Sequence, residues 1–172
     1  MKNSLSAKVS AVVFFLLLSL FLSANANADT TRVYDNAKCF SAEEITALEE
    51  KIHEFRLRTK TDFCILITDD FLGNDPLAIA GIFYDSMGLG IGPNQGGIVL
   101  YIDLYNRIPA ISTCGEMVLI LSGDKLDSVF DSMYTFLADG EYSVAMIAAI
   151  EQVDSILADY WARWLGGGTV TE

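Results

Sequence analysis

Carboxylates are the residues of this chain whose type and placement could do chemistry. Oxygen-rich loops suit Ca²⁺ or Mg²⁺, and sites in α/β proteins form where strands end. The aspartates near predicted strand ends and helix starts are Asp35, Asp69, Asp70, Asp85, Asp103, Asp124 and Asp127. Acids in the first turn of a helix also oppose the helix dipole without binding any ligand, which explains Asp124 and Asp127. Asp35 has no obvious local role in the sequence.

A nucleophile with a partner base is not found in the sequence. His53 is the chain's one histidine; it lies beside the apolar stripe of a predicted helix and is far in sequence from Cys114. Ser112 and Thr113 end a predicted strand without the Gly-x-Ser-x-Gly elbow of the α/β hydrolases. The sequence therefore gives no support to a Cys–His or Ser–His hydrolase.

The glycine-rich run at 88–97 follows a predicted helix and precedes a predicted strand. A dinucleotide fingerprint has the opposite order, with the phosphate at the start of the following helix, and no Walker lysine follows this run. We therefore expect no nucleotide ligand. The glycines predict a turn in which the backbone comes close to its neighbours.

The first 28 residues have the pattern of a signal peptide. Lys2 and Lys8 precede an apolar stretch, Ala11–Leu22, and Ala26-Asn27-Ala28 is a small-x-small cleavage pattern. The stretch would reach about 18 Å as a helix, short of a hydrocarbon core of about 30 Å. We expect an exported protein that begins near Asp29. The alternative is an uncleaved anchor, so membrane association is expected only for the uncleaved precursor.

The chain is acidic, with a formal charge of −12 that becomes −14 when Lys2 and Lys8 are removed. Nucleic acids need cationic partners for their phosphates, so a nucleic-acid partner is not expected. Anionic lipid is disfavoured for the same reason. The acidity is compatible with hard cations, but such charge more commonly serves solubility.

Three cysteines, Cys39, Cys64 and Cys114, leave at least one thiol unpaired within the chain. A Cys39–Cys64 disulfide would stabilise the fold by about 3.5 kcal/mol in the chain-entropy model. Alternatively, Cys64 is a free thiol that acts as a small apolar residue inside a buried strand. Both interpretations stay open at the level of sequence.

Capping patterns and apolar periodicity predict the elements of the first half. Ser41-Ala-Glu-Glu44 is a capping box, and the apolar stripe that follows predicts a helix to about Lys60. The run 63–68 predicts a strand covered on both faces. Asp75 before Pro76 predicts a helix over 76–87.

The second half predicts a strand pair followed by two helices. Strands are expected at 98–102 and 108–113, the second at a sheet edge because Pro109 cannot donate to a ladder. Helical stripes follow over 126–137 and 142–161. This order predicts an α/β fold, a three-layer α/β/α sandwich with a small mixed sheet flanked by helices. The domain is expected over 29–164, with a flexible glycine-rich tail at 165–172.

From Val33 to about Leu157 the chain resembles the TPM domain family, found in thylakoid-lumen and photosystem-repair proteins and in many exported bacterial ones. The features that match are Val33-x-Asp35, the helix start at Ser41, the strand 63–68, Gly90-x-Gly92 before Gly97-Ile-Val-Leu, Arg107, and Ile111-Ser-Thr-x-Gly115. The resemblance implies a three-layer α/β/α fold, often with bound Ca²⁺ or another divalent cation. It also implies weak acid-phosphatase activity for some members and a role in assembling or repairing membrane complexes for others.

The same resemblance implies that Asp35 and Asp124 are metal ligands. Asp35 matches the acidic position near the family's start, and Asp124 lies one place after the acid that usually opens the next helix. Gly96, Asn106 and Gly123 stand where relatives tend to have other, mostly acidic, residues. Because divalent affinity depends on the number and charge of the ligands, a metal site in this chain is expected to be weakened or lost.

Two functions are compatible with the sequence. In the first, the protein is an exported, non-catalytic interaction or assembly module at the cell envelope, with an envelope protein as its partner. In the second, it is a weak acid phosphatase whose divalent ion, held by Asp35 and Asp124, orients phosphate and water. The depleted acidic positions and the missing nucleophile favour the first.

Overall fold

The computed structural model of this protein describes residues 31–69, 75–92 and 95–165. A compact unit begins at Arg32. The predicted signal peptide, residues 1–28, lies outside the described residues, as do residues 166–172 of the predicted tail 165–172, whose first residue, Leu165, ends the last helix. Along the described part of the chain, no helix combines the length and apolar character needed to cross a bilayer.

The elements of the domain alternate between helices and strands until the strand pair, and helices complete the chain. In order they are β1 (Val33–Asp35), α2 (Ala42–Thr59), β2 (Asp62–Thr68), α3 (Pro76–Ser86), β3 (Gly97–Asp103), β4 (Ile108–Cys114), α4 (Met117–Ile120), α5 (Asp124–Asp139) and α6 (Tyr142–Leu165). The strands form one sheet in the order β1-β2-β3-β4. β1, β2 and β3 are parallel, and β4 is antiparallel to β3. The predicted mixed sheet is confirmed, with Pro109 on edge strand β4.

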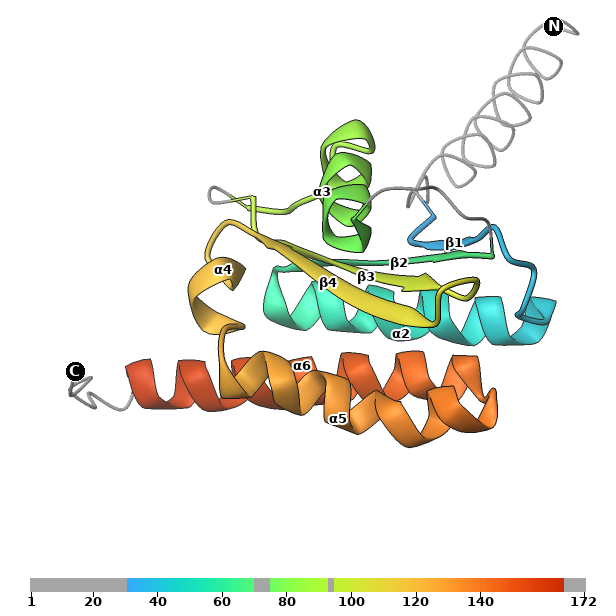
Figure 1. Ribbon diagram of the computed structural model, residues 1–172. Helices are drawn as coiled ribbons and strands as arrows, with labels where there is room; N and C mark the ends of the chain where they lie inside the picture. Colours follow the sequence, from blue (N-terminus) through green and yellow to red (C-terminus); the bar gives the residue numbers. More distant parts are fainter. Residues whose placement is uncertain (1–30, 70–74, 93–94, 166–172) are drawn as a thin grey trace, which may run out of the picture. The chain divides into compact units, whose positions relative to one another are not determined.

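Helices cover both faces of the sheet, as the predicted three-layer sandwich requires. Figure 1 shows α3 on one face and α2, α5 and α6 on the other. Alternate side chains of a strand point to opposite faces, so Ile65 and Ile67 of β2 join the core beneath α2, whereas Cys64 and Leu66 join the cluster beneath α3. All of β2 and β3 is buried, which explains their continuous apolar sequences.

The larger core lies between the sheet and the helices α2, α5 and α6. Leu48, Ile52 and Phe55 of α2 are almost completely buried in it. α6 contributes a whole apolar stripe, consisting of Ala145, Met146, Ala149, Ile150, Val153, Ile156 and Leu157. The amphipathic spacing that predicts these helices therefore marks the faces that meet in the core.

Local side-chain contacts fix where the helices begin. Ser41 Oγ accepts from the Glu44 amide at 3.2 Å, and the Glu44 carboxylate accepts from the Ser41 amide at 2.8 Å. The capping box is thereby confirmed. The Asp75 carboxylate caps α3 by accepting from the Leu77 amide at 3.2 Å, with Pro76 in the first turn.

Helix α4 is an element that the sequence pattern does not predict. It is a single turn between β4 and α5. Met117 and Ile120 are buried in the larger core, whereas Val118 and Leu119 are 52% and 81% exposed. One turn is too short to produce a recognisable helical period, so tertiary packing decides its conformation.

The glycine-rich loop accommodates the side chain of Tyr84. A Cβ at Gly97 would lie 2.6 Å from the Tyr84 ring, and a Cβ at Gly90 would clash with the Tyr84 hydroxyl. That hydroxyl donates a hydrogen bond of 2.7 Å to the carbonyl of Gln95. The prediction of close backbone approach is confirmed: the glycines make room for a tyrosine from α3.

The cysteines are free, and the disulfide that the sequence leaves open does not form. Cys39 packs against the core beneath α2, whereas Cys64 belongs to the cluster beneath α3, so the sheet separates them. Burial raises the pKa of both thiols to about 12, and for Cys39 the neighbouring Asp35 carboxylate adds to this effect. Neither thiol is therefore an activated nucleophile.

Candidate functional site

The carboxyl ends of the parallel strands meet at one edge of the sheet, where sites in α/β proteins form. Asp35 ends β1, Thr68 ends β2 and Asp103 ends β3, and Thr68 is paired in register with Asp103. β2 lies between the other two strands, so the backbones at Asp35 and Asp103 are roughly 10 Å apart. Asp69, which is exposed, directly follows Thr68, so this edge contains three of the aspartates that the sequence analysis identifies.

Asp35 has a local structural role that its sequence context does not reveal. Its carboxylate accepts hydrogen bonds from the Cys39 amide at 3.1 Å and the Phe40 amide at 2.9 Å. The Cys39 thiol also donates to it, at 3.4 Å. These bonds hold the turn that carries the chain from β1 to α2. The interpretation that Asp35 lacks a local role is wrong, although a carboxylate oxygen with one hydrogen bond still has a free lone pair.

Asp103 is buried, with 2% of its surface exposed, and organises the turn between β3 and β4. Its two oxygens accept from the amide nitrogen of Asn106 at 2.9 Å and from the Asn106 side-chain nitrogen at 2.7 Å. Next to it, the hydroxyls of Thr68 and Tyr101 share a hydrogen bond of 3.0 Å. The side chains of Asp103, Thr68 and Tyr101 are thus hydrogen-bonded to neighbours.

Asp124 does not lie at this edge. It is exposed and is the first residue of α5. The residue before it, Gly123, is the N-cap and has no side chain to cap the helix. β4 runs back so that Cys114 pairs with Gly97 at the start of β3, and α4 and the start of α5 follow there, opposite the end of β1 (Figure 1). The structure therefore does not bring Asp35 and Asp124 together. Among the residues that the structure describes, no group of three or more His, Cys, Asp or Glu side chains is arranged to hold a metal ion.

A groove of about 680 Å³ opens beside the turn between β3 and β4. Its walls come from the end of this strand pair and from the corner between α5 and α6. Most lining side chains are apolar or aromatic: Ile102, Leu104, Pro109, Tyr134, Leu137 and Tyr142. Arg107 and Asp139 supply the charges. These residues come from elements far apart in sequence, so the sequence analysis identifies Arg107 only through the family resemblance and misses the groove.

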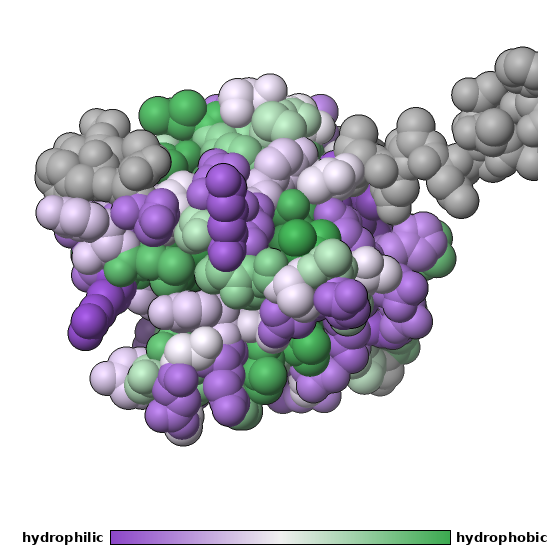
Figure 2. Space-filling view, turned by 90° about the vertical axis from the view of Figure 1, so that its right-hand side faces the viewer, coloured by the Kyte–Doolittle hydropathy of each residue, from purple (hydrophilic) through white to green (hydrophobic). Residues whose placement is uncertain are grey.

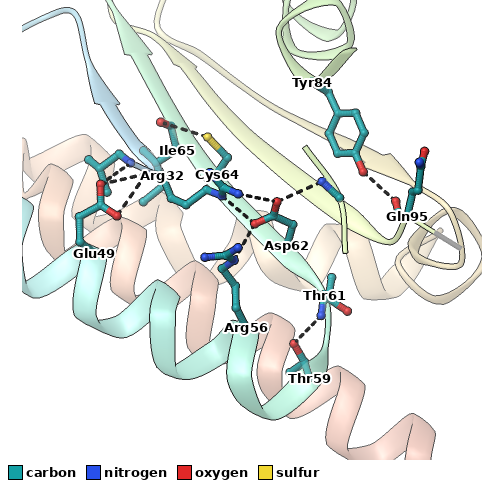
Figure 3. Close-up of polar contacts among 12 residues, drawn as sticks. Arg32, Glu49, Arg56, Thr59, Thr61, Asp62, Cys64, Ile65, Tyr84 and Gln95 are labelled. Carbon is teal, nitrogen blue, oxygen red and sulfur yellow. Dashed lines mark hydrogen bonds and ion pairs between the residues drawn. The ribbon is translucent and has the colours of Figure 1, made fainter. Parts of the chain in front are cut away.

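A buried ionic cluster lies at the opposite, amino-terminal edge of the parallel strands (Figure 3). The Asp62 carboxylate, 1% exposed, accepts from Arg32 Nε at 2.8 Å and from Arg32 Nη2 at 3.1 Å. Arg56 Nε lies 2.9 Å from the same carboxylate, and the Gly90 amide donates to it at 3.0 Å. One carboxylate thus joins the start of the domain, helix α2, strand β2 and the glycine-rich loop.

The cluster fixes the entry of the chain into the domain. Burial alone lowers the pKa of Arg32, but its hydrogen bond and charge pairing with Asp62 raise that pKa above its usual value. Glu49 of α2 accepts from the backbone amides of Arg32 and Val33, each at 2.9 Å. The sequence offers one signal for this cluster, an aspartate immediately before an apolar strand, since a buried carboxylate needs a partner.

Comparison with known proteins assigns the chain to a family. The family model of the TPM domain matches residues 33–156, from β1 into α6. The chain belongs to the TPM domain family. The resemblance inferred from sequence is thereby confirmed, and the match includes the carboxyl edge, the groove and all of the ionic cluster except Arg32.

A curated relative of this TPM domain is the UPF0603 protein YdjH of Bacillus subtilis (strain 168). The two are 28% identical over 144 residues, which is 83% of this chain and 55% of the relative. The chain thus spans about half the length of the curated relative that it matches.

Solved structures with low sequence identity share the TPM fold. The N-terminal domain of a P. gingivalis protein superposes with a TM-score of 0.67 at 19% identity, covering 77% of this chain and 86% of that one. The BA42 protein of Bizionia argentinensis gives 0.64 at 17% identity, with 70% and 83% covered. At these identities the likeness concerns the fold alone.

Proposed function

We propose that this TPM domain is an exported, non-catalytic interaction or assembly module that acts at the cell envelope on an envelope protein. The signal-peptide pattern of residues 1–28 supports export. The hydrogen bonds of Asp35 and Asp103 support a structural use of these acids. The observation that carries the proposal is the outward face of α3.

Helix α3 is apolar on the side that faces solvent as well as on the side that packs on the sheet. Ala80 and Tyr84 are buried, whereas Leu77 and Ile82 are 53% and 68% exposed. Figure 2 shows hydrophobic residues gathered toward the top of the molecule, where α3 lies in Figure 1. A helix that is apolar all round is normally covered on both sides, and exposed apolar patches mark interaction sites. We define the α3 face as Leu77, Ala78 and Ile82.

The charges around the α3 face indicate the chemistry of its partner. Asp75 caps the start of the helix and Asp85 lies in its last turn, and α3 itself contains no Lys or Arg. Charge complementarity favours a protein surface that is apolar at its centre and basic at its rim. The same acids disfavour anionic lipid.

The experiment that tests the proposal is crosslinking and co-purification from the cells that make the protein. Wild-type chain is compared with Ile82→Glu, which places a charge in the α3 face, and with the matched control Leu57→Glu. Leu57 is 58% exposed on α2, so its replacement adds the same charge elsewhere. We expect the same partner with wild type and Leu57→Glu, and its loss with Ile82→Glu. A partner retained by folded Ile82→Glu, or lost equally from both variants, would contradict the proposal.

The second candidate function is weak, divalent-metal-dependent acid phosphatase activity. One observation favours it: Asp35 and Asp103 both end parallel strands at the edge where α/β sites form. A metal ion there would have to orient phosphate and a water molecule. Hydrolysis of p-nitrophenyl phosphate with Ca²⁺ or Mg²⁺ tests this. Under this function Asp35→Asn abolishes turnover, and Asp124→Asn, at the other edge, does not.

A further inference from the structure

Hydrogen bonds hold the rim of the groove beside the β3–β4 turn. The Leu104 amide donates to the Thr68 carbonyl at 2.8 Å, which ties the turn to β2. Asp103 holds the other side of the turn through Asn106. Arg107, which follows, has a φ of +57°, a left-handed conformation that non-glycine residues rarely adopt. Hydrogen bonds on both sides of the turn thus hold the segment that places Arg107 at the rim.

The charges of the groove lie on opposite walls. Arg107 comes from the strand pair, and Asp139 comes from the end of α5. Both are exposed, and within the described part of the chain neither forms an ion pair with a neighbour. Between them lie apolar walls, including Leu137 and Tyr134, a residue that is 73% exposed.

The apolar groove, with a cation on one wall and an anion on the other, determines what kind of ligand fits it. The ligand must bury aliphatic or aromatic groups between the walls, place a carboxylate at Arg107 and place a cation at Asp139. A small anion satisfies only one of these three requirements. A peptide segment satisfies all three, because it can carry an acid and a base on either side of apolar residues.

We propose that this groove binds a peptide segment of a partner protein, with an apolar centre, an acidic residue that pairs with Arg107 and a basic residue that pairs with Asp139. The inference rests on the proposed role as an interaction module, but it concerns a surface separate from the α3 face. Figure 2 faces the end of the domain that carries the strand turn and the α5–α6 corner, and hydrophobic residues are exposed there among hydrophilic ones. Because Arg107 and Asp139 lie on opposite walls, the acid and the base of the peptide lie on opposite sides of its apolar centre.

The test is selection of peptides from a random display library on the purified full chain. Wild type should enrich peptides with an apolar centre between one acid and one base. The double variant Arg107→Glu with Asp139→Lys should enrich the same apolar centre with the acid and base exchanged. The matched control Arg163→Glu, an exposed arginine at the far end of α6, should enrich the wild-type peptides.

Affinity of a synthetic peptide from the wild-type selection provides the second readout. Arg107→Glu and Tyr134→Ala should each weaken its binding about tenfold, and Ile82→Glu on the α3 face should leave it unchanged. No enriched peptides, or peptides whose charge order does not follow the double variant, would overturn the inference. If the peptide selection fails but Ile82→Glu still loses the envelope partner, the groove proposal alone is refuted. If the peptide selection fails and the co-purification test also contradicts the α3 face, the interaction role is refuted as well.

Discussion

At the scale of single residues, Asp62 is the carboxylate on which the buried charges depend. It is the shared partner of Arg32 and Arg56, so Asp62→Ala would remove the buried carboxylate that both guanidinium groups contact. Removing one member of such a cluster costs about 3–5 kcal/mol. We expect the free energy of unfolding, measured with urea, to fall by that amount.

The matched control for Asp62 is Asp124→Ala. Asp124 is exposed in the first turn of α5, where its interaction with the helix dipole is worth about 0.3–1 kcal/mol. Equal losses for the two variants would show that the ionic cluster does not stabilise the domain.

Gly97 offers a second test at this scale. A Cβ there would lie 2.6 Å from the Tyr84 ring, so Gly97→Ala should force the ring or the strand to move. Overpacking of this kind costs about 1–3 kcal/mol, measurable by urea denaturation. At neighbouring Gly96, a Cβ would meet only Glu116, at 3.7 Å. Gly96→Ala should therefore be nearly neutral, and a loss as large as that of Gly97→Ala would refute the explanation.

Single residues are also where sequence reasoning reaches its limit. The glycines of the loop signal a close approach, but not that the approaching group is Tyr84. Asp35 has no role visible in the sequence because its partners are the amides of Cys39 and Phe40, which depend on the conformation of the turn. The sequence does not identify the partners of Asp62, because nothing in it distinguishes Arg32 and Arg56 from exposed arginines.

At the scale of elements, Glu44 joins the start of α2 to the start of α6. The Ser143 hydroxyl donates to its carboxylate, as does the Ser41 amide, and these bonds lower the pKa of Glu44 in the folded protein. Because the folded pKa lies below the unfolded one, the resulting stability is complete above the unfolded pKa. It is lost as the pH falls through the folded pKa.

We therefore expect Glu44→Gln to lower the free energy of unfolding at neutral pH and to differ progressively less from wild type as the solution becomes acidic. Urea denaturation across this pH range measures the difference. Glu43→Gln, an exposed residue of the same helical turn, is the control. A deficit in Glu44→Gln that stays constant down to strongly acidic pH would contradict the pKa argument.

Elements with a chemical signal at their start are the ones that sequence predicts well. The capping box at Ser41 and the proline at 76 give the starts of α2 and α3, and Pro109 gives the edge position of β4. Helix α4 has no such signal: its N-cap residue, Glu116, makes no capping hydrogen bond. Its existence depends on the burial of Met117 and Ile120, which only the assembled core provides.

At the scale of the whole molecule, thermal unfolding in EDTA and across a calcium titration separates the two proposed functions. A ligand at about a hundred times its Kd stabilises the folded state by about 2.7 kcal/mol, which raises Tm by several degrees. For an interaction module we expect no saturable shift at millimolar Ca²⁺. A saturable rise that Asp35→Asn abolishes and Asp124→Asn retains would instead support a metal site at the carboxyl edge.

The alternating order of helices and strands predicts the three layers, because such an order leaves few ways to cover a small sheet. The candidate sites are less predictable. The groove forms because the β3–β4 turn lies beside the α5–α6 corner. These segments are far apart in the chain, so no local sequence pattern predicts their contact. Asp35 and Asp124 are linked by family resemblance, but the chain direction places them at opposite edges of the sheet.

The order of the strands in the sheet has a consequence for how the chain folds. The strands lie side by side in the order in which they are synthesised, so each new strand can add to the edge left by the previous one. Helix α6, which packs on α2 and α5, comes last. Until it docks, the part of the apolar side of α2 that packs on α6 has no cover, and such surfaces promote aggregation of folding intermediates. The sheet can therefore assemble while the core is still open, so a chain whose synthesis stops before α6 is expected to aggregate.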